Sequence, residues 1–192
     1  MTNLVLQRRL IVTYPDNSWI RWLVALFMIL LIIISFQPAR ASPIEIQNLD
    51  WFAEESRPYI DKQSGAWATG ATATVIDVQT GISFTAVRYR GTNHADFEPC
   101  TQSDTEALKS IYGRWAWTRR PVVVIIAGEA FAASMNAMPH GKESITDNGY
   151  PGHSCLHFLN SKTHGSRKVD KKHQAAVMEA HNTDLEILER GN

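Results

Sequence analysis

The stretch ATATVIDVQTGISFTAVRYR, from Ala71 to Arg90, decides which kind of fold this chain can form. Thr and Val are frequent in it, and polar and apolar side chains alternate, as they do in strands with one buried face. Thr80-Gly81 lies between the two halves and is a turn signal. We therefore expect two antiparallel strands, at residues 71–79 and 82–90, that form a β-hairpin.

A second hairpin is predicted further along the chain. Pro121 opens the apolar run VVVIIA, Gly128-Glu129 forms a turn, and Phe131 to Asn136 can pair back. A further strand is expected at residues 153–158, whereas the segment from 91 to 99 is expected to be a loop.

Two helices should accompany these strands. Ser103 and Glu106 have the spacing of a capping box, which predicts a helix over residues 103–114. Asp170 can cap a later helix that exposes His173 to solvent. The expected fold class is α+β, mainly β: an antiparallel sheet or sandwich of hairpins with one central and one C-terminal helix.

The first 41 residues have the pattern of a signal peptide. Arginines precede the apolar run Trp22–Phe36, and Ala39-Arg40-Ala41 then matches a signal-peptidase site. Cleavage after Ala41 is expected, with an uncleaved signal anchor as the alternative. In both cases residues 42–192 form a single extracytoplasmic domain, secreted or held in a bacterial cell envelope, with membrane contact only through the N-terminal segment.

The charge balance argues against a nucleic-acid partner. The chain has 19 basic and 19 acidic residues, and residues 1–41 hold four of the arginines and one aspartate. The remaining 15 basic and 18 acidic residues give no positive excess that could neutralise phosphates.

Reactive side chains gather between residues 138 and 165, which hold four of the seven histidines and one of the two cysteines. His153, Cys155 and His157 alternate, so in an extended strand they share one face. His140 lies beyond a polar loop that can fold back onto this face. A thiol beside an imidazole is typical of a nucleophile with its base.

The same side chains also allow a metal site. His140, His153, Cys155 and His157 could bind zinc in a zinc-dependent cell-wall peptidase or amidase. His164 is a further candidate ligand, and His94 with Asp96 could add to the set. A non-catalytic cell-wall-binding module is the remaining alternative. His94 and Asp96 are expected to form a hydrogen-bonded pair that fixes a loop, and whether Cys100 and Cys155 form a disulfide stays open.

His140-Gly141 precedes Cys155 by thirteen intervening residues, and the cysteine lies in GHSCLH, residues 152–157. This arrangement resembles the signature of YkuD-type L,D-transpeptidases, in which a His-Gly or His-Ser pair and a loop of similar length lead to S/T-H-G-C-I/V-R. The resemblance covers about residues 70–160. It implies that Cys155 is the nucleophile and His140 its base, with the Gly141 carbonyl orienting His140.

The resemblance further implies cysteine-dependent acyl transfer on peptidoglycan stem peptides, as an L,D-transpeptidase or L,D-carboxypeptidase, with no cofactor. His153 would lie beside the oxyanion position, with backbone N–H groups of residues 153–155 as donors. Asn136, Ser154 and His157 are expected to bind substrate. Gly152, Ser154 and His157 differ from the residues of the family signature, so the domain resembles a divergent member.

Overall fold

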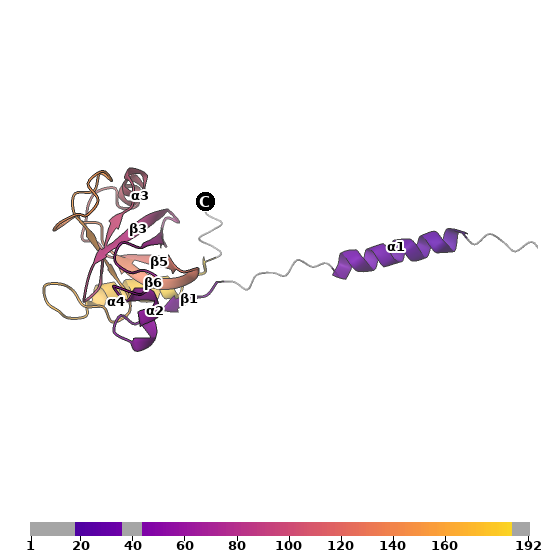
Figure 1. Ribbon diagram of the computed structural model, residues 1–192, viewed down its shortest axis with the longest axis horizontal. Helices are drawn as coiled ribbons and strands as arrows, with labels where there is room; N and C mark the ends of the chain where they lie inside the picture. Colours follow the sequence, from indigo (N-terminus) through magenta and orange to yellow (C-terminus); the bar gives the residue numbers. More distant parts are fainter. Residues whose placement is uncertain (1–17, 36–43, 186–192) are drawn as a thin grey trace, which may run out of the picture. The chain divides into compact units, whose positions relative to one another are not determined.

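The computed structural model describes residues 18–35 and 44–185 (Figure 1). They belong to two units, residues 1–42 and 43–192. In the first unit, helix α1 (Ser18–Ser35) coincides with most of the apolar run. No helix of the described residues has both the length and the apolar character that a membrane crossing requires. The predicted cleavage motif at 39–41 lies outside the described residues.

The second unit is built on one sheet that closes on itself. Strands β6, β5, β2, β3, β4 and β7 follow one another, and β7 pairs back with β6. All six contacts in this ring are antiparallel, whereas β1 joins β6 in parallel. The strands are β1 (Ile46–Asn48), β2 (Thr72–Asp77), β3 (Ser83–Arg90), β4 (Ala95–Pro99), β5 (Arg120–Ile126), β6 (Glu129–Met135) and β7 (Ser154–His157).

Strand β6 allows the closure because one of its edges serves two partners. Ala130–Ala132 pairs with β1, and Ser134–Met135 pairs with β7. The short β1 therefore leaves the end of β6 free to complete the barrel. Closure lets backbone N–H and C=O groups form hydrogen bonds that would be missing at the edges of an open sheet.

The α+β class and its antiparallel character are confirmed, and so are both predicted hairpins. β2 pairs with β3, and β5 pairs with β6. The second turn contains Ala127 and Gly128, both with positive φ, of 53° and 84°. Two positive φ values are the requirement of the tight hairpin turn that matches the strand twist.

Two local predictions were wrong. The segment 91–99 is not all loop, because Ala95–Pro99 forms β4 between β3 and β7. Every residue of β4 is buried, including the acidic residues Asp96 and Glu98, and acidic residues and proline are disfavoured in strands. Helix α3 (Gln102–Tyr112) is capped by Thr101 with Asp104, two residues before the predicted box.

The core lies inside the barrel and continues under a helix on its outer face. Val122 and Val124 of β5 point into the interior cluster, and Val123 points outward. Helix α4 (Lys171–His181) covers that outer face and contributes Val177. The remaining short helices are η1 (Glu54–Ser56) and α2 (Arg57–Ile60).

His173 is the exception to the expected exposure of this last helix. Asp170 caps α4 as predicted, but His173 is only 2 % exposed and contacts Ser134 of β6, with 2.9 Å between Nδ1 and Oγ. The prediction failed because the helix turns this side of its first turn toward the sheet.

Candidate active site

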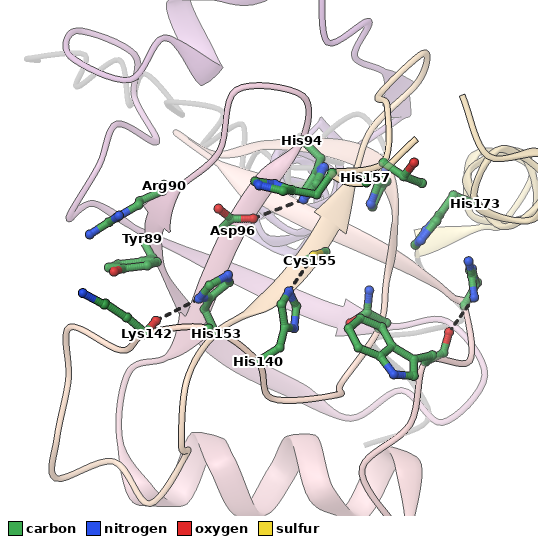
Figure 2. A pocket seen from close by; sticks show the side chains of 17 residues that line it. Tyr89, Arg90, His94, Asp96, His140, Lys142, His153, Cys155, His157 and His173 are labelled. Carbon is green, nitrogen blue, oxygen red and sulfur yellow. Dashed lines mark hydrogen bonds and ion pairs between the residues drawn. The ribbon is translucent and has the colours of Figure 1, made fainter. Parts of the chain in front are cut away.

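The alternation predicted for the last strand is confirmed. Leu156 of β7 belongs to the interior core, whereas His153, Cys155 and His157 line a cavity of about 540 Å³ (Figure 2). Cys155 is only 6 % exposed, but the cavity reaches its side chain. The fold therefore presents a thiol at the wall of a cavity of the size that binds small ligands.

His140 approaches the thiol from the opposite segment. Its Nε2 lies 3.5 Å from Cys155 Sγ (Figure 2). Its Nδ1 lies 2.8 Å from the Met138 carbonyl oxygen. When Nδ1–H donates to this carbonyl, Nε2 can accept the thiol proton. The expected role of the Gly141 carbonyl was wrong, because the chain turns after His140 and the carbonyl two residues earlier faces the ring.

Two glycines allow the histidine segments to approach each other. His140 and His153 pair through two backbone hydrogen bonds of 3.0 Å each. Gly152 has φ +114°, and a Cβ there would lie 2.7 Å from the His140 oxygen. A Cβ on Gly141, with φ +70°, would lie 2.5 Å from the His153 ring. Gly141 thus contributes space rather than a carbonyl.

His153 lines the cavity, but its backbone N–H already forms a hydrogen bond. Its N–H donates to the His140 oxygen, so it is not a free oxyanion donor. Its ring Nδ1 lies 2.8 Å from the Lys142 oxygen, and the ring packs against those of Tyr89 and His140. These contacts hold the side chain at the cavity wall.

A buried carboxylate anchors the loop between the two histidine segments. Glu98 of β4 is fully buried and accepts hydrogen bonds from the backbone N–H groups of Ser144 and Ile145, at 2.8 to 3.1 Å. The Ser144 hydroxyl adds a third donor at 2.8 Å. A charged acceptor with several aligned donors is a strong tether.

A second imidazole beside the thiol comes from the segment preceding β4. His94 Nδ1 lies 2.7 Å from the Lys162 oxygen, and Nε2 lies 3.1 Å from Asp96 Oδ1, an ion-pair distance without good hydrogen-bond alignment. We expected this pair to fix a loop, with additional metal ligands as the alternative. It lies instead at the cavity, because β4 pairs Asp96 directly with Cys155.

These neighbours favour a charged sulfur. Burial opposes charge on His94, but Asp96 and Cys155 outweigh it and raise the pKa of His94 to about 10. Burial likewise opposes the thiolate, yet His140 and His94 lower the pKa of Cys155 below its usual value. The contact with Cys155 also raises the pKa of His140, against the effect of burial. The two imidazole groups therefore favour the thiolate form of Cys155.

Three imidazole rings are stacked along one side of the cavity. His157 lies between His94 and His173, with ring centroids 4.4 Å and 3.7 Å away. Burial, and then the nearby charges, lower the pKa of His157 far below its usual value. Burial and Arg119 lower the pKa of His173 to about 3. Both rings are therefore neutral near pH 7.

The expected metal-ligand set is corrected by this geometry. Among the described residues, the group whose ligand atoms lie close enough to hold one ion is His94, Cys155 and His157. His140 and His153 are not part of it. Sequence alternation suggested His153, and His94 was expected only as an additional ligand. The segment that precedes β4 brings His94 to the cysteine.

The three expected substrate-binding residues lie differently. Asn136 and His157 line the cavity. Ser154 does not: it is fully buried on the other face of β7, where its hydroxyl contacts Tyr150 and the Met138 oxygen. The same alternation that turns Cys155 to the cavity turns Ser154 away from it. Cys155 and Cys100 are both free thiols.

Basic side chains at the cavity went unnoticed in the sequence. Arg90, Arg119 and Lys142 line it, and Arg119 is paired with Asp170 at 3.2 Å. Neither Arg90 nor Lys142 forms an ion pair with another described residue. No motif marks these residues, since they come from three separate segments.

Comparison of the chain with protein-family models, with curated proteins and with solved structures finds no match.

Proposed function

We propose that this domain is a cysteine-dependent acyltransferase that acts on peptidoglycan stem peptides, as an L,D-transpeptidase or L,D-carboxypeptidase. One observation carries the proposal: Cys155 Sγ lies 3.5 Å from His140 Nε2, while the Met138 carbonyl holds Nδ1 of the same ring. A nucleophile, its base and an orienting group are the minimum that this chemistry needs.

The proposed first step forms a thioester. The Cys155 thiolate attacks a peptide carbonyl carbon, and the C–N bond breaks as protonated His140 gives its proton to the leaving amine. In the second step His140 takes a proton from an incoming amine or water. The nucleophile then displaces the sulfur, which returns as thiolate and leaves a new amide or a carboxylate.

His94 has a separate part in this proposal. It is 1 % exposed and close to Asp96, so its positive charge is held beside the sulfur. A fixed charge stabilises the thiolate before substrate binds. His140 is less buried and lies across the sulfur from the strand, which suits the group that moves protons.

The charge at the cavity supports an anionic peptide as substrate. Arg90 and Lys142 are exposed at its wall, and Arg119 lies deeper. The acidic group at the same wall, Asp96, forms an ion pair with His94. Stem peptides carry carboxylates, and such groups bind well to arginine and lysine.

Intact-mass spectrometry of the reduced protein tests the proposal. After exposure to a carbapenem, we expect one covalent adduct on the wild-type chain and none on Cys155→Ser. Cys100→Ser is the matched control and should keep the adduct. His140→Gln should slow its formation by about 10²–10⁴-fold, the usual contribution of a general base.

The same experiment has a clear negative outcome. A wild-type chain that forms no adduct at Cys155, with the chelator EDTA present, would overturn acyl transfer. The cell-wall-binding module would then be the better account, and Cys155→Ser should bind peptidoglycan as the wild type does.

A further inference from the structure

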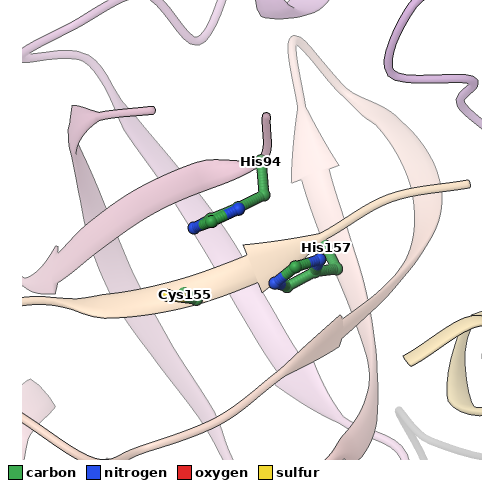
Figure 3. A group of neighbouring side chains, drawn as sticks. All are labelled: His94, Cys155 and His157. Atoms are coloured by element: carbon green, nitrogen blue, oxygen red, sulfur yellow. The ribbon is translucent and has the colours of Figure 1, made fainter. Parts of the chain in front are cut away.

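The side chains behind the nucleophile have the composition of a soft-metal site. The ligand atoms of His94, Cys155 and His157 all lie within 4.8 Å of one another (Figure 3). A tetrahedral zinc with ordinary Zn–N and Zn–S bonds places its ligand atoms roughly 3.5 Å apart. Movements of about 1 Å are therefore enough to close the three side chains around an ion.

His94 is already oriented as a ligand. Its Nδ1 lies 2.7 Å from the Lys162 carbonyl oxygen, which leaves Nε2 as the ring nitrogen that can bind a metal ion. A backbone carbonyl on the other ring nitrogen is the usual outer-shell partner of a zinc-bound histidine. Asp96, 3.1 Å from Nε2, adds negative charge beside the position of the ion.

His157 supplies the second and independent observation. The residue is 2 % exposed, and its Nδ1 has no hydrogen-bond partner among the described residues. Buried ring nitrogens are rarely left in this state, and each one calls for an explanation. A histidine that is buried, unsatisfied and stacked in place beside a thiol is well suited to bind a metal ion.

We propose that His94, Cys155 and His157 form a zinc site that reversibly switches the nucleophile off. Zinc replaces the protons of the thiol and of His94, and the sulfur lone pair enters a Zn–S bond. No electron is transferred. Zinc binding rests on the three side chains alone, whereas the inhibition also rests on the proposed acyl transfer.

Metal binding is measured without any activity assay. The purified protein is titrated with zinc against a chromophoric chelator, and with Co²⁺ to observe a thiolate-to-cobalt charge-transfer band. We expect one ion per chain and the charge-transfer band. His157→Phe keeps a stacked ring but removes the ligand, and it should weaken zinc binding by at least about tenfold.

His153→Phe is the matched control. His153 lines the same cavity but lies outside the cluster, so zinc affinity should stay within about twofold of the wild-type value. Equal zinc affinity of His157→Phe and the wild type would overturn the site, and so would a cobalt complex without the charge-transfer band. If His157→Phe does not fold, His157→Gln replaces it, with thermal melting as the check.

The switch itself is tested on the wild-type chain. Zinc should slow iodoacetamide labelling of Cys155 at least about tenfold, and EDTA should restore the rate. Carbapenem acylation should respond in the same way. Unchanged labelling with bound zinc, or acylation that requires zinc, would overturn the switch.

These outcomes separate the two proposals. Acylation in EDTA reports on acyl transfer, and cobalt or zinc binding reports on the metal site. A chain that binds zinc but never forms an adduct would refute the acyltransferase and leave the site intact.

Discussion

At the scale of the residue, the thiol of Cys155 lies between two imidazoles that differ in environment. His140 is half-buried and held by one carbonyl. His94 is buried beside a carboxylate, which favours its charged form. The same residue type thus suits two tasks, because burial and neighbours set the protonation of each ring.

Asp96→Asn should separate these tasks. Loss of the carboxylate lowers the pKa of His94, and the weaker positive charge lets the pKa of Cys155 rise. Iodoacetamide labelling at pH 7 should slow roughly tenfold, and its pH profile should move to higher pH. Asp147→Asn, an exposed change in the loop that follows His140, is the control and should leave the profile in place. Identical profiles for Asp96→Asn and the wild type would contradict the role given to His94.

At the scale of the element, β4 organises the site from within the barrel. It pairs with β7 beside the cysteine and carries Asp96 at the cavity. Two residues later, Glu98 holds the loop that joins His140 to His153. One short strand therefore positions both the carboxylate beside His94 and the loop that joins His140 to His153.

Glu98→Gln should loosen this loop. An amide cannot accept all three hydrogen bonds, and its NH₂ group would face N–H donors. Lost hydrogen bonds to a charged group predict a decrease of about 1.5–3 kcal/mol in the free energy of unfolding. Faster proteolysis at residues 141–152 is also expected. Glu143→Gln, an exposed change in the same loop, should alter neither measurement. Equal stability of both variants would show that Glu98 is no tether.

At the scale of the whole molecule, closure of the barrel and packing of α4 create the histidine stack. His94 precedes β4, His157 ends β7 and His173 starts the outer helix. Burial keeps the last two rings neutral. The folded protein therefore resists their protonation, and this links its stability to pH.

Unfolding by urea should be easier in acid, with EDTA present. His157 and His173 have pKa values below 6.5 in the folded protein. Above pH 6.5 both rings are neutral in the folded and in the unfolded chain, so they do not make the free energy of unfolding depend on pH. Below pH 6.5 the two imidazoles become protonated in the unfolded chain but stay neutral in the folded one, so the free energy of unfolding falls. It stops falling when the pH reaches the pKa of each ring in the folded protein, about 3 for His173. Each ring contributes a slope of up to about 1.4 kcal/mol per pH unit.

His173→Gln is the comparison for this pH dependence. Below pH 6.5 the free energy of unfolding of His173→Gln should depend less steeply on pH, by the contribution of one imidazole. His181→Gln, at the other end of α4, should leave this slope unchanged. An equally steep pH dependence below pH 6.5 in His173→Gln and the wild type would refute the contribution assigned to His173.

Much of the fold could be predicted from local pattern. Alternation marked β2 and β3, and an apolar run with a turn marked β5 and β6. Strand β4 was missed although apolar and polar residues alternate in it, because it is short and contains Asp96, Glu98 and Pro99, residue types that are disfavoured in strands. The exposed position given to His173 failed for another reason: helical spacing does not say which neighbour a polar side chain will face.

The sequence by itself determined the antiparallel α+β class, the shared face of His153, Cys155 and His157, and a His140 segment that could fold back toward the thiol. Each follows from chain geometry over a few residues or one loop. Only the tertiary structure decided that His94 joins the cysteine, that Ser154 turns away from the cavity and that the Met138 carbonyl orients His140. Those contacts depend on strand pairing and closure of the sheet, and segments that meet in this way leave no local pattern in the sequence.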